Sequence, residues 1–247
     1  MKSKILIPLL TLACLLAMPA RAQVNYEIYG SVAYVAISPN ASGNVVIASS
    51  YNGYPVVSIG DLAFFECTSL TSVTIPNSVT SIGAWAFFSC TNLTSVMIPN
   101  SVTSIGPRAF SSTSQTSVMI PASVTNIGSL AFFSVGLTNI SVDAANAVYS
   151  SLDGVLFNKA QTTLIQFPNG RGGSYAIPNT VTNIGAYAFQ GCSSLTSVVI
   201  PGSVTKYNVI SNCIYQIPQR RRRVALGRDQ RRNVGSTAAM TSSRAAK

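Results

Sequence analysis

The chain of 247 residues has no histidine, and charged residues make up only 9% of it. It therefore lacks the commonest general base and the commonest metal ligand. No G-x-S-x-G motif would place a serine nucleophile between a strand and a helix. The five acidic residues between 23 and 205 are scattered, without the pairing that glycoside hydrolysis needs. We therefore expect a protein that is not an enzyme, with no catalytic residue, no cofactor and no metal site.

The net charge of +10 is concentrated at the two ends of the chain. Ten basic residues and one acidic residue lie from Lys206 onward, whereas the segment 23–205 has three basic and five acidic residues. That segment has a net charge of −2, so the basic balance gives no indication that it binds nucleic acid. A candidate contact for a polyanion is the cluster of Arg220, Arg221, Arg222 and Arg223. No aromatic residues alternate with these arginines, and we expect no specific nucleic-acid partner.

The first 22 residues have the pattern of a secretory signal peptide. Two lysines precede an apolar run over residues 5–18, and the small residues Ala20 and Ala22 form a cleavage site. The run is too short for a membrane span, which needs about 20 apolar residues. The sequence therefore predicts cleavage after Ala22, a mature chain without a transmembrane segment, and a secreted or cell-surface location.

One unit is repeated along the chain with the consensus L-T-S-V-x-I-P-x-S-V-T-x-I-G-x-x-A-F. Its Ile-Gly step recurs at Gly60, Gly83, Gly106, Gly128 and Gly185, with spacings of 23, 23, 22 and 57 residues. A period of about 20–29 residues with regularly placed leucine is typical of a leucine-rich repeat solenoid. We expect each coil to add one β-strand to a parallel sheet on one face. A short helical or 3-10 turn, starting at the Ala-Phe pair, should form the opposite face.

The apolar positions of each coil define a predicted core. One phenylalanine per coil should point inward, and the rings should form one continuous stack of Phe64, Phe87, Phe110, Phe132 and Phe189. The proline after each strand ends it, because proline cannot donate the next ladder hydrogen bond. The glycine after each isoleucine is expected to allow a tight turn that a Cβ atom would obstruct.

Two places depart from the repeat. The coil after Phe110 is one residue shorter than its predecessor and has Gln115 where that coil has Leu93. We expect it to be the least stable coil unless Gln115 finds a polar partner. The longest gap between Ile-Gly steps contains an irregular insert at about 141–174, in which the apolar runs 148–159 and 163–168 predict a β-hairpin.

The ends of the repeat region differ from its centre. Residues 23–54 contain short apolar runs between turn residues, which predict an N-terminal cap of antiparallel strands over the first coil. The solenoid is expected to extend over 55–205. The segment 206–247 breaks off in the middle of a repeat, and its clustered arginines and low hydrophobicity predict a basic, disordered tail.

Four cysteines follow the predicted signal peptide. Cys67, Cys90 and Cys192 share one repeat position, at which other coils have threonine or valine, and this small site predicts buried thiols. Successive coils lie about 4.8 Å apart, so a disulfide between Cys67 and Cys90 is the alternative. The pattern does not fix the redox state of Cys213.

The segment 75–90, IPNSVTSIGAWAFFSC, closely resembles the repeat unit of the BspA-like leucine-rich repeat family. The segment 153–159, DGVLFNK, is similar to an irregular insert common in that family, and the resemblance extends over about residues 45–205. It implies a bacterial protein that is secreted or displayed at the cell surface. Some family members act as adhesins for host matrix proteins or other cells, and the family has no catalytic motif.

The outward positions of the predicted strands are the candidate ligand face, because they alternate with core positions along one parallel sheet. They are Ser72, Thr74, Ser95, Met97, Ser117, Met119, Ser197 and Val199. A row of hydroxyls with an exposed pair of methionines suits a protein strand or a glycan. The alternative is that these residues only suit a soluble sheet surface. A second group, Leu62, Trp85, Leu130 and Tyr187, forms either an exposed patch on the convex side or packing between coils.

These patterns favour a non-enzymatic, secreted or cell-surface leucine-rich repeat protein that binds a protein or glycan in an adhesion-type interaction. The alternative is a structural or truncated fragment of a longer repeat array without independent function. In that case the sequence after Val204 would come from a shift of the reading frame.

Overall fold

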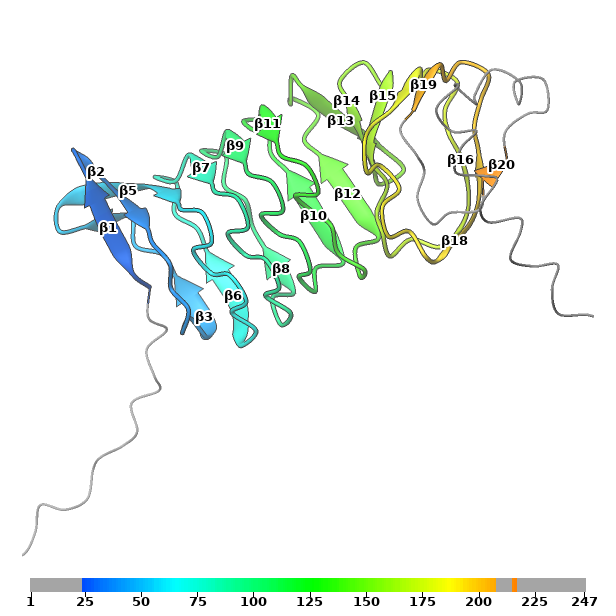
Figure 1. The fold of residues 1–247 in the computed structure, drawn as a ribbon. Helices are drawn as coiled ribbons and strands as arrows, with labels where there is room; N and C mark the ends of the chain where they lie inside the picture. Colours follow the sequence, from blue (N-terminus) through cyan, green and yellow to red (C-terminus); the bar gives the residue numbers. More distant parts are fainter. Residues whose placement is uncertain (1–23, 208–214, 217–247) are drawn as a thin grey trace, which may run out of the picture.

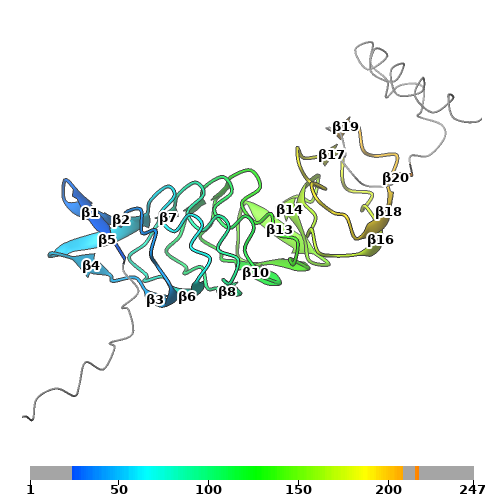
Figure 2. The same ribbon diagram turned by 60° about the horizontal axis from the view of Figure 1, so that its bottom comes forward.

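The computed structural model describes residues 24–207 and 215–216, which form an elongated solenoid (Figure 1). Successive coils stack along one long axis, from β1 at one end to β18 and β20 at the other (Figures 1 and 2). The leucine-rich repeat solenoid predicted from the sequence is confirmed. The predicted signal peptide, Cys213 and the arginine cluster at 220–223 lie outside the described residues.

One side of the solenoid is built from parallel strands, one from each coil. They form three sheets, in the orders β3-β6-β8, β10-β12 and β16-β18-β20. The strands are β3 (Gly43–Val46), β6 (Leu70–Thr74), β8 (Ser95–Val96), β10 (Ser117–Ile120), β12 (Asn139–Val142), β16 (Gly173–Ala176), β18 (Leu195–Val199) and β20 (Tyr215–Gln216). Their side chains alternate between core and surface, as Val73 and Ile75 are buried while Thr74 between them is exposed.

The Ile-Gly steps form short parallel strands on a second side. Before the insert these are β5 (Tyr54–Ile59), β7 (Ser81–Ile82), β9 (Ser104–Ile105) and β11 (Asn126–Ile127). The second group is β17 (Asn183–Ile184), which pairs with β15 (Thr163–Gln166) of the insert and with β19 (Lys206–Tyr207), two strands that lack the Ile-Gly step. The N–H of Gly106 donates to the carbonyl of Ile82 in the preceding coil at 2.8 Å. A Cβ atom at Gly106 would lie 2.5 Å from the backbone nitrogen of Ala84. The glycine is therefore needed because the neighbouring coil lies so close.

The third side, which follows each glycine, contains no helix or 3-10 turn in the described residues, so this part of the prediction is wrong. The chain makes successive β-turns there, as Ala63 donates to Gly60 at 3.3 Å. Other N–H groups bond to the next coil, as Phe64 does to Ala86 at 2.7 Å. A positive φ in each coil prevents a helix. These residues are Leu62, Trp85, Arg108, Leu130 and Tyr187, with φ between 54° and 65°.

The core contains two stacks of phenylalanine rings. Phe64, Phe87, Phe110 and Phe132 are stacked with successive centroid distances of 5.1, 5.1 and 5.7 Å. Beyond the insert, Phe189 stacks at 5.4 Å on Phe167, which the repeat pattern did not identify. The predicted continuous stack is wrong, because the insert divides the buried apolar residues into two clusters.

The insert is built from β13 (Tyr149–Leu152), β14 (Val155–Asn158) and β15. The antiparallel pair β14–β15 confirms the predicted hairpin. The run 148–159 is itself a second hairpin, because Asp153 and Gly154, with φ of 50° and 73°, form a tight turn between β13 and β14. Buried Asn146 fixes the start of the insert by donating to two carbonyl groups of the preceding coil at 2.8 and 2.9 Å.

The N-terminal strands only partly follow the predicted pattern. β1 (Tyr26–Tyr29) and β2 (Val32–Val35) are antiparallel, and so are β4 (Ser50–Tyr51) and β5. In contrast, β3 is parallel to β6 and belongs to the sheet of the repeats. The prediction of antiparallel strands is therefore wrong for β3, whose neighbour is the next coil.

The last described coil continues past the predicted start of the disordered tail. Lys206 and Tyr207 form β19, which is parallel to β17, and Lys206 donates to the carbonyl of Thr182 at 3.2 Å. Tyr207 occupies the place of the repeat isoleucine and is 39% exposed. The prediction of disorder from residue 206 onward is therefore wrong for these two residues. Their backbone can pair with β17 because this pairing does not require the isoleucine side chain of the repeat.

The shortened coil after Phe110 interrupts the sheet. β8 and β10 are neighbours but do not pair. Gln115 is 3% exposed, and its side-chain Nε2 has no hydrogen-bond partner. Because a buried amide without a partner has lost its hydrogen bonds to water, this position lowers the stability of the fold.

Replacing Gln115 with leucine should raise the free energy of unfolding by about 1–2 kcal/mol, because it removes an unpaired buried amide. Denaturant-induced unfolding of the chain measures the change. The reverse substitution in the preceding coil, Leu93→Gln, is the matched control and should lower the stability. A decrease for Gln115→Leu would show that the glutamine has a stabilising role.

The described cysteines are buried, and Cys67 and Cys90 are free thiols as predicted. The Cys67 Sγ lies 3.2 Å from the carbonyl oxygen of Ser38, and the Cys90 Sγ lies 3.0 Å from that of Phe64. Burial, with the nearby Cys67 as a second cause, raises the pKa of Cys90 to about 12. Burial also raises the pKa of the Cys67 thiol. Both thiols therefore remain protonated near neutral pH and act as small apolar core residues.

Candidate functional site

The outward side chains of β3, β6, β8, β10 and β12, together with Met97 directly after β8, form a surface that we call the front face. The register pairs Asn44 with Ser72, Ser72 with Ser95, and Ser117 with Asn139. The polar row of the front face consists of Asn44, Ser72, Ser95, Ser117 and Asn139. The outer row consists of Val46, Thr74, Met97, Met119 and Ser141. None of these ten side chains is charged.

The outer row exposes large apolar side chains. Met97 is 84% exposed, Val46 is 71% exposed and Met119 is 57% exposed. The polar row is hydrogen-bonded within itself, as the Ser72 hydroxyl donates to the Asn44 Oδ1 at 2.8 Å. The front face therefore combines a ridge of apolar groups with a parallel line of small groups that can donate and accept hydrogen bonds.

Six of the eight residues predicted for the ligand face lie together on the front face: five are on β6, β8 and β10, and Met97 directly follows β8. The other two, Ser197 and Val199, lie on β18 in the sheet β16-β18-β20, which does not pair with β12. The prediction missed Asn139 and Ser141, although residues 137–142, LTNISV, repeat the strand pattern of the other coils. It also missed β3, which has no leucine to mark its repeat.

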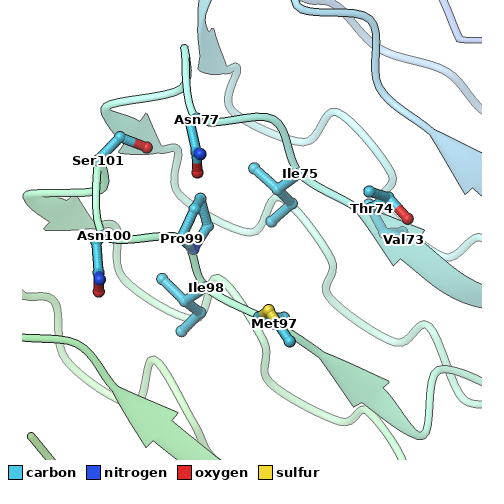
Figure 3. Close-up of a pocket in the computed structure, with 9 residues that line it drawn as sticks. All are labelled: Val73, Thr74, Ile75, Asn77, Met97, Ile98, Pro99, Asn100 and Ser101. Carbon is cyan, nitrogen blue, oxygen red and sulfur yellow. The ribbon is translucent and has the colours of Figure 1, made fainter.

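A cleft of about 510 Å³ opens beside Met97, where the chain leaves β6 and β8. Figure 3 shows Ile75, Asn77 and Pro99 directed toward a common space between the two coils, with Met97 at its edge. Ile75 is buried, whereas Asn77 is exposed at the rim. The cleft thus has an apolar floor and an amide at its border, and it extends the front face around the end of the sheet.

The second predicted group does not form one exposed patch. Trp85 packs on Phe88 at 4.7 Å between ring centroids and on Phe65 at 6.4 Å. The Arg108 guanidinium lies 4.9 Å from the centre of the Trp85 ring. This aromatic cluster joins three successive coils, so Trp85 packs between coils. Tyr187, which is 55% exposed, lies beyond the insert.

The described part of the chain contains no candidate metal site. No three His, Cys, Asp or Glu residues there lie close enough to hold a metal ion. Asp61 accepts a hydrogen bond from the backbone N–H of Ala84 at 2.6 Å, and so links two coils. Within 24–207 and 215–216, no helix is long and apolar enough to cross a membrane.

The repeat geometry agrees with a sequence-family model described as the BspA type leucine-rich repeat region, which matches six copies over residues 44–162 and 166–219. The chain belongs to this BspA-type leucine-rich repeat family. BspA-type proteins are typically secreted or surface proteins of bacteria. The match extends past residue 205, in line with the pairing of β19 and β20.

Solved structures of other proteins share this fold. The pneumococcal vaccine antigen PcpA has a TM-score of 0.59 and 18% identity over 76% of this chain. The chain covers 65% of the PcpA structure, less than two thirds of its length. A leucine-rich repeat protein from Eubacterium ventriosum has a TM-score of 0.54 and 22% identity, with 75% of this chain and 68% of that chain covered. A comparison with curated protein sequences gives no match.

Proposed function

We propose that this BspA-type chain is a secreted or cell-surface binding protein without enzymatic activity. It binds a protein ligand through the front face, in an adhesion-type interaction. The observation that carries the proposal is the outer row, in which Val46, Met97 and Met119 are 71%, 84% and 57% exposed on the same side of the solenoid. Large apolar side chains gathered on an otherwise polar surface mark a site of interaction.

The chemistry of the front face favours a protein over a glycan or a polyanion. Methionine is enriched in protein interfaces, where its flexible thioether adapts to the partner surface. The ten residues include no aromatic ring on which a sugar could stack and no cation for a sulfate or phosphate. The polar row supplies hydroxyl and amide groups for hydrogen bonds to a backbone or to polar side chains.

The double substitution Met97→Asp and Met119→Asp should weaken ligand binding at least about tenfold. The two carboxylates would lose their hydration when the bound ligand covers them. Binding of the mature chain to immobilised matrix proteins and to whole cells is measured with and without the substitutions. Both methionines are exposed, so the melting temperature should remain close to that of the unsubstituted chain.

Two further variants locate the site. Val199→Asp changes an exposed apolar residue on the separate sheet with β16, and Tyr187→Asp changes one on the turn side. Neither should change binding if the front face is the site. If the unsubstituted chain binds glycans but no protein, the front face would be a carbohydrate site. If it binds no matrix protein, cell or glycan, the proposed function would be contradicted.

A further inference from the structure

We propose that Met97 and Met119 form a site of reversible oxidation, at which a peroxide converts the outer row of the front face from apolar to polar. They are the only methionines among the described residues, and they occupy the same repeat position on neighbouring coils. The effect on ligand binding rests on the proposed function. The oxidation itself does not.

Both sulfur atoms belong to side chains that are open to solvent. Met97 is 84% exposed and Met119 is 57% exposed, whereas large apolar side chains elsewhere in the repeats are mostly buried in the core. Oxidation of a thioether depends on access of the oxidant to sulfur. The corresponding side chains of the other coils on the front face are Val46, Thr74 and Ser141, which peroxide does not oxidise. The chemistry is therefore confined to the middle of the row.

The two methionines differ in their neighbours. The Ser141 Oγ lies 3.5 Å from the Met119 Sδ and also donates to the carbonyl of Val118 at 3.1 Å. A hydroxyl proton shared with the sulfur lowers the availability of the lone pair that attacks the oxidant. No side-chain hydrogen bond to Met97 occurs among residues 24–207, so Met97 is the more reactive of the two.

The reaction is a two-electron transfer of one oxygen atom. The sulfur lone pair attacks one oxygen of hydrogen peroxide, the O–O bond breaks, and the other oxygen leaves as water after proton transfer. The thioether is oxidised to the sulfoxide and the peroxide is reduced. Methionine sulfoxide reductases return the thioether by oxidising thiols to a disulfide, with release of water.

Oxidation changes what the face offers to a partner. A sulfoxide carries a strong dipole and a hydrogen-bond acceptor. A partner that covers the ridge would have to desolvate this polar group, which costs free energy. At Met119, the hydroxyl of Ser141 is within reach to donate to the new sulfoxide oxygen. We therefore expect each buried sulfoxide to weaken binding about tenfold.

The first test needs no ligand. The mature chain is treated with hydrogen peroxide, quenched, denatured and digested with trypsin, and the gain of oxygen is followed by mass spectrometry. Cleavage after Arg108 places Met97 and Met119 in different peptides. Met97 should be oxidised at least about twofold faster than Met119, and Ser141→Ala should reduce this difference. If neither residue gains oxygen under conditions that oxidise free methionine completely, the proposal is overturned.

The second test measures binding to the matrix protein or cell that the unoxidised chain recognises. The double variant Met97→Leu and Met119→Leu keeps the apolar ridge and cannot be oxidised, so its binding should survive peroxide. The unsubstituted chain should lose binding after treatment with peroxide. It should regain binding after treatment with the two methionine sulfoxide reductases, one for each epimer of the sulfoxide. Binding that is unchanged by complete oxidation overturns the inference alone, whereas no binding before oxidation overturns the proposed function.

Discussion

Replacing Gly106 with alanine should lower the free energy of unfolding by about 3 kcal/mol, at the upper end of the range for overpacking. The new Cβ would lie 2.5 Å from the nitrogen of Ala84, 2.6 Å from the carbonyl carbon of Gly83 and 2.9 Å from the Cα of Ala84. All three atoms are backbone, so no side chain can rotate away. The Gly106 N–H also donates to Ile82 at 2.8 Å, and separating the coils would stretch this bond.

The matched control is Gly185→Ala, at the same repeat position beyond the insert. Its Cβ would lie 3.1 Å from the carbonyl oxygen of Leu164, with the next atoms at 3.7 Å. The loss of stability should therefore be much smaller than at Gly106. Denaturant-induced unfolding of the two variants provides the comparison. Equal losses at the two glycines would show that the turn itself, and not the neighbouring coil, requires glycine.

The second large effect is expected from Phe87→Ala, which should cost about 3–5 kcal/mol because it leaves a cavity in the middle of the stack. Phe87 is fully buried, and its ring lies 5.1 Å from both Phe64 and Phe110. No flexible side chain lies between these rings to fill the space. Calorimetric and denaturant-induced unfolding should both show the loss.

Phe87→Leu serves as the control for volume. It keeps most of the apolar volume and removes only the stacked ring, so its cost should stay below about 2 kcal/mol. If the two substitutions destabilise the chain equally, ring stacking would outweigh cavity formation. If neither has an effect, the phenylalanine stack does not support the solenoid.

The front face could be predicted because strand alternation is a local property. Ser72 and Thr74 point outward on either side of buried Val73, and the repeat carries this alternation from coil to coil. β3 was assigned to the cap instead, because its parallel partner is the next coil and no leucine marks its start. The exposure of the methionines depends on the neighbouring coils, which the sequence alone does not position.

The turn side and the insert were less predictable, for different physical reasons. Bulky residues such as Leu62 and Trp85 disfavour a positive φ, so their local preference pointed to a helical turn. Hydrogen bonds to the next coil offset this strain, as Phe64 donates to Ala86 at 2.7 Å. Phe167 was missed because the hairpin before it replaces the Ile-Gly step that marks the other stacked rings.

The division of the core has a consequence for how the solenoid would respond to a pulling force. Hydrogen bonds between coils run along the long axis, so a pulling force in that direction would load and open them successively rather than together. At the insert, both parallel ladders are interrupted, between β11 and β15 and between β12 and β16. The solenoid should therefore yield first at this junction. The coils that carry the front face would stay folded while the rest of the chain extends.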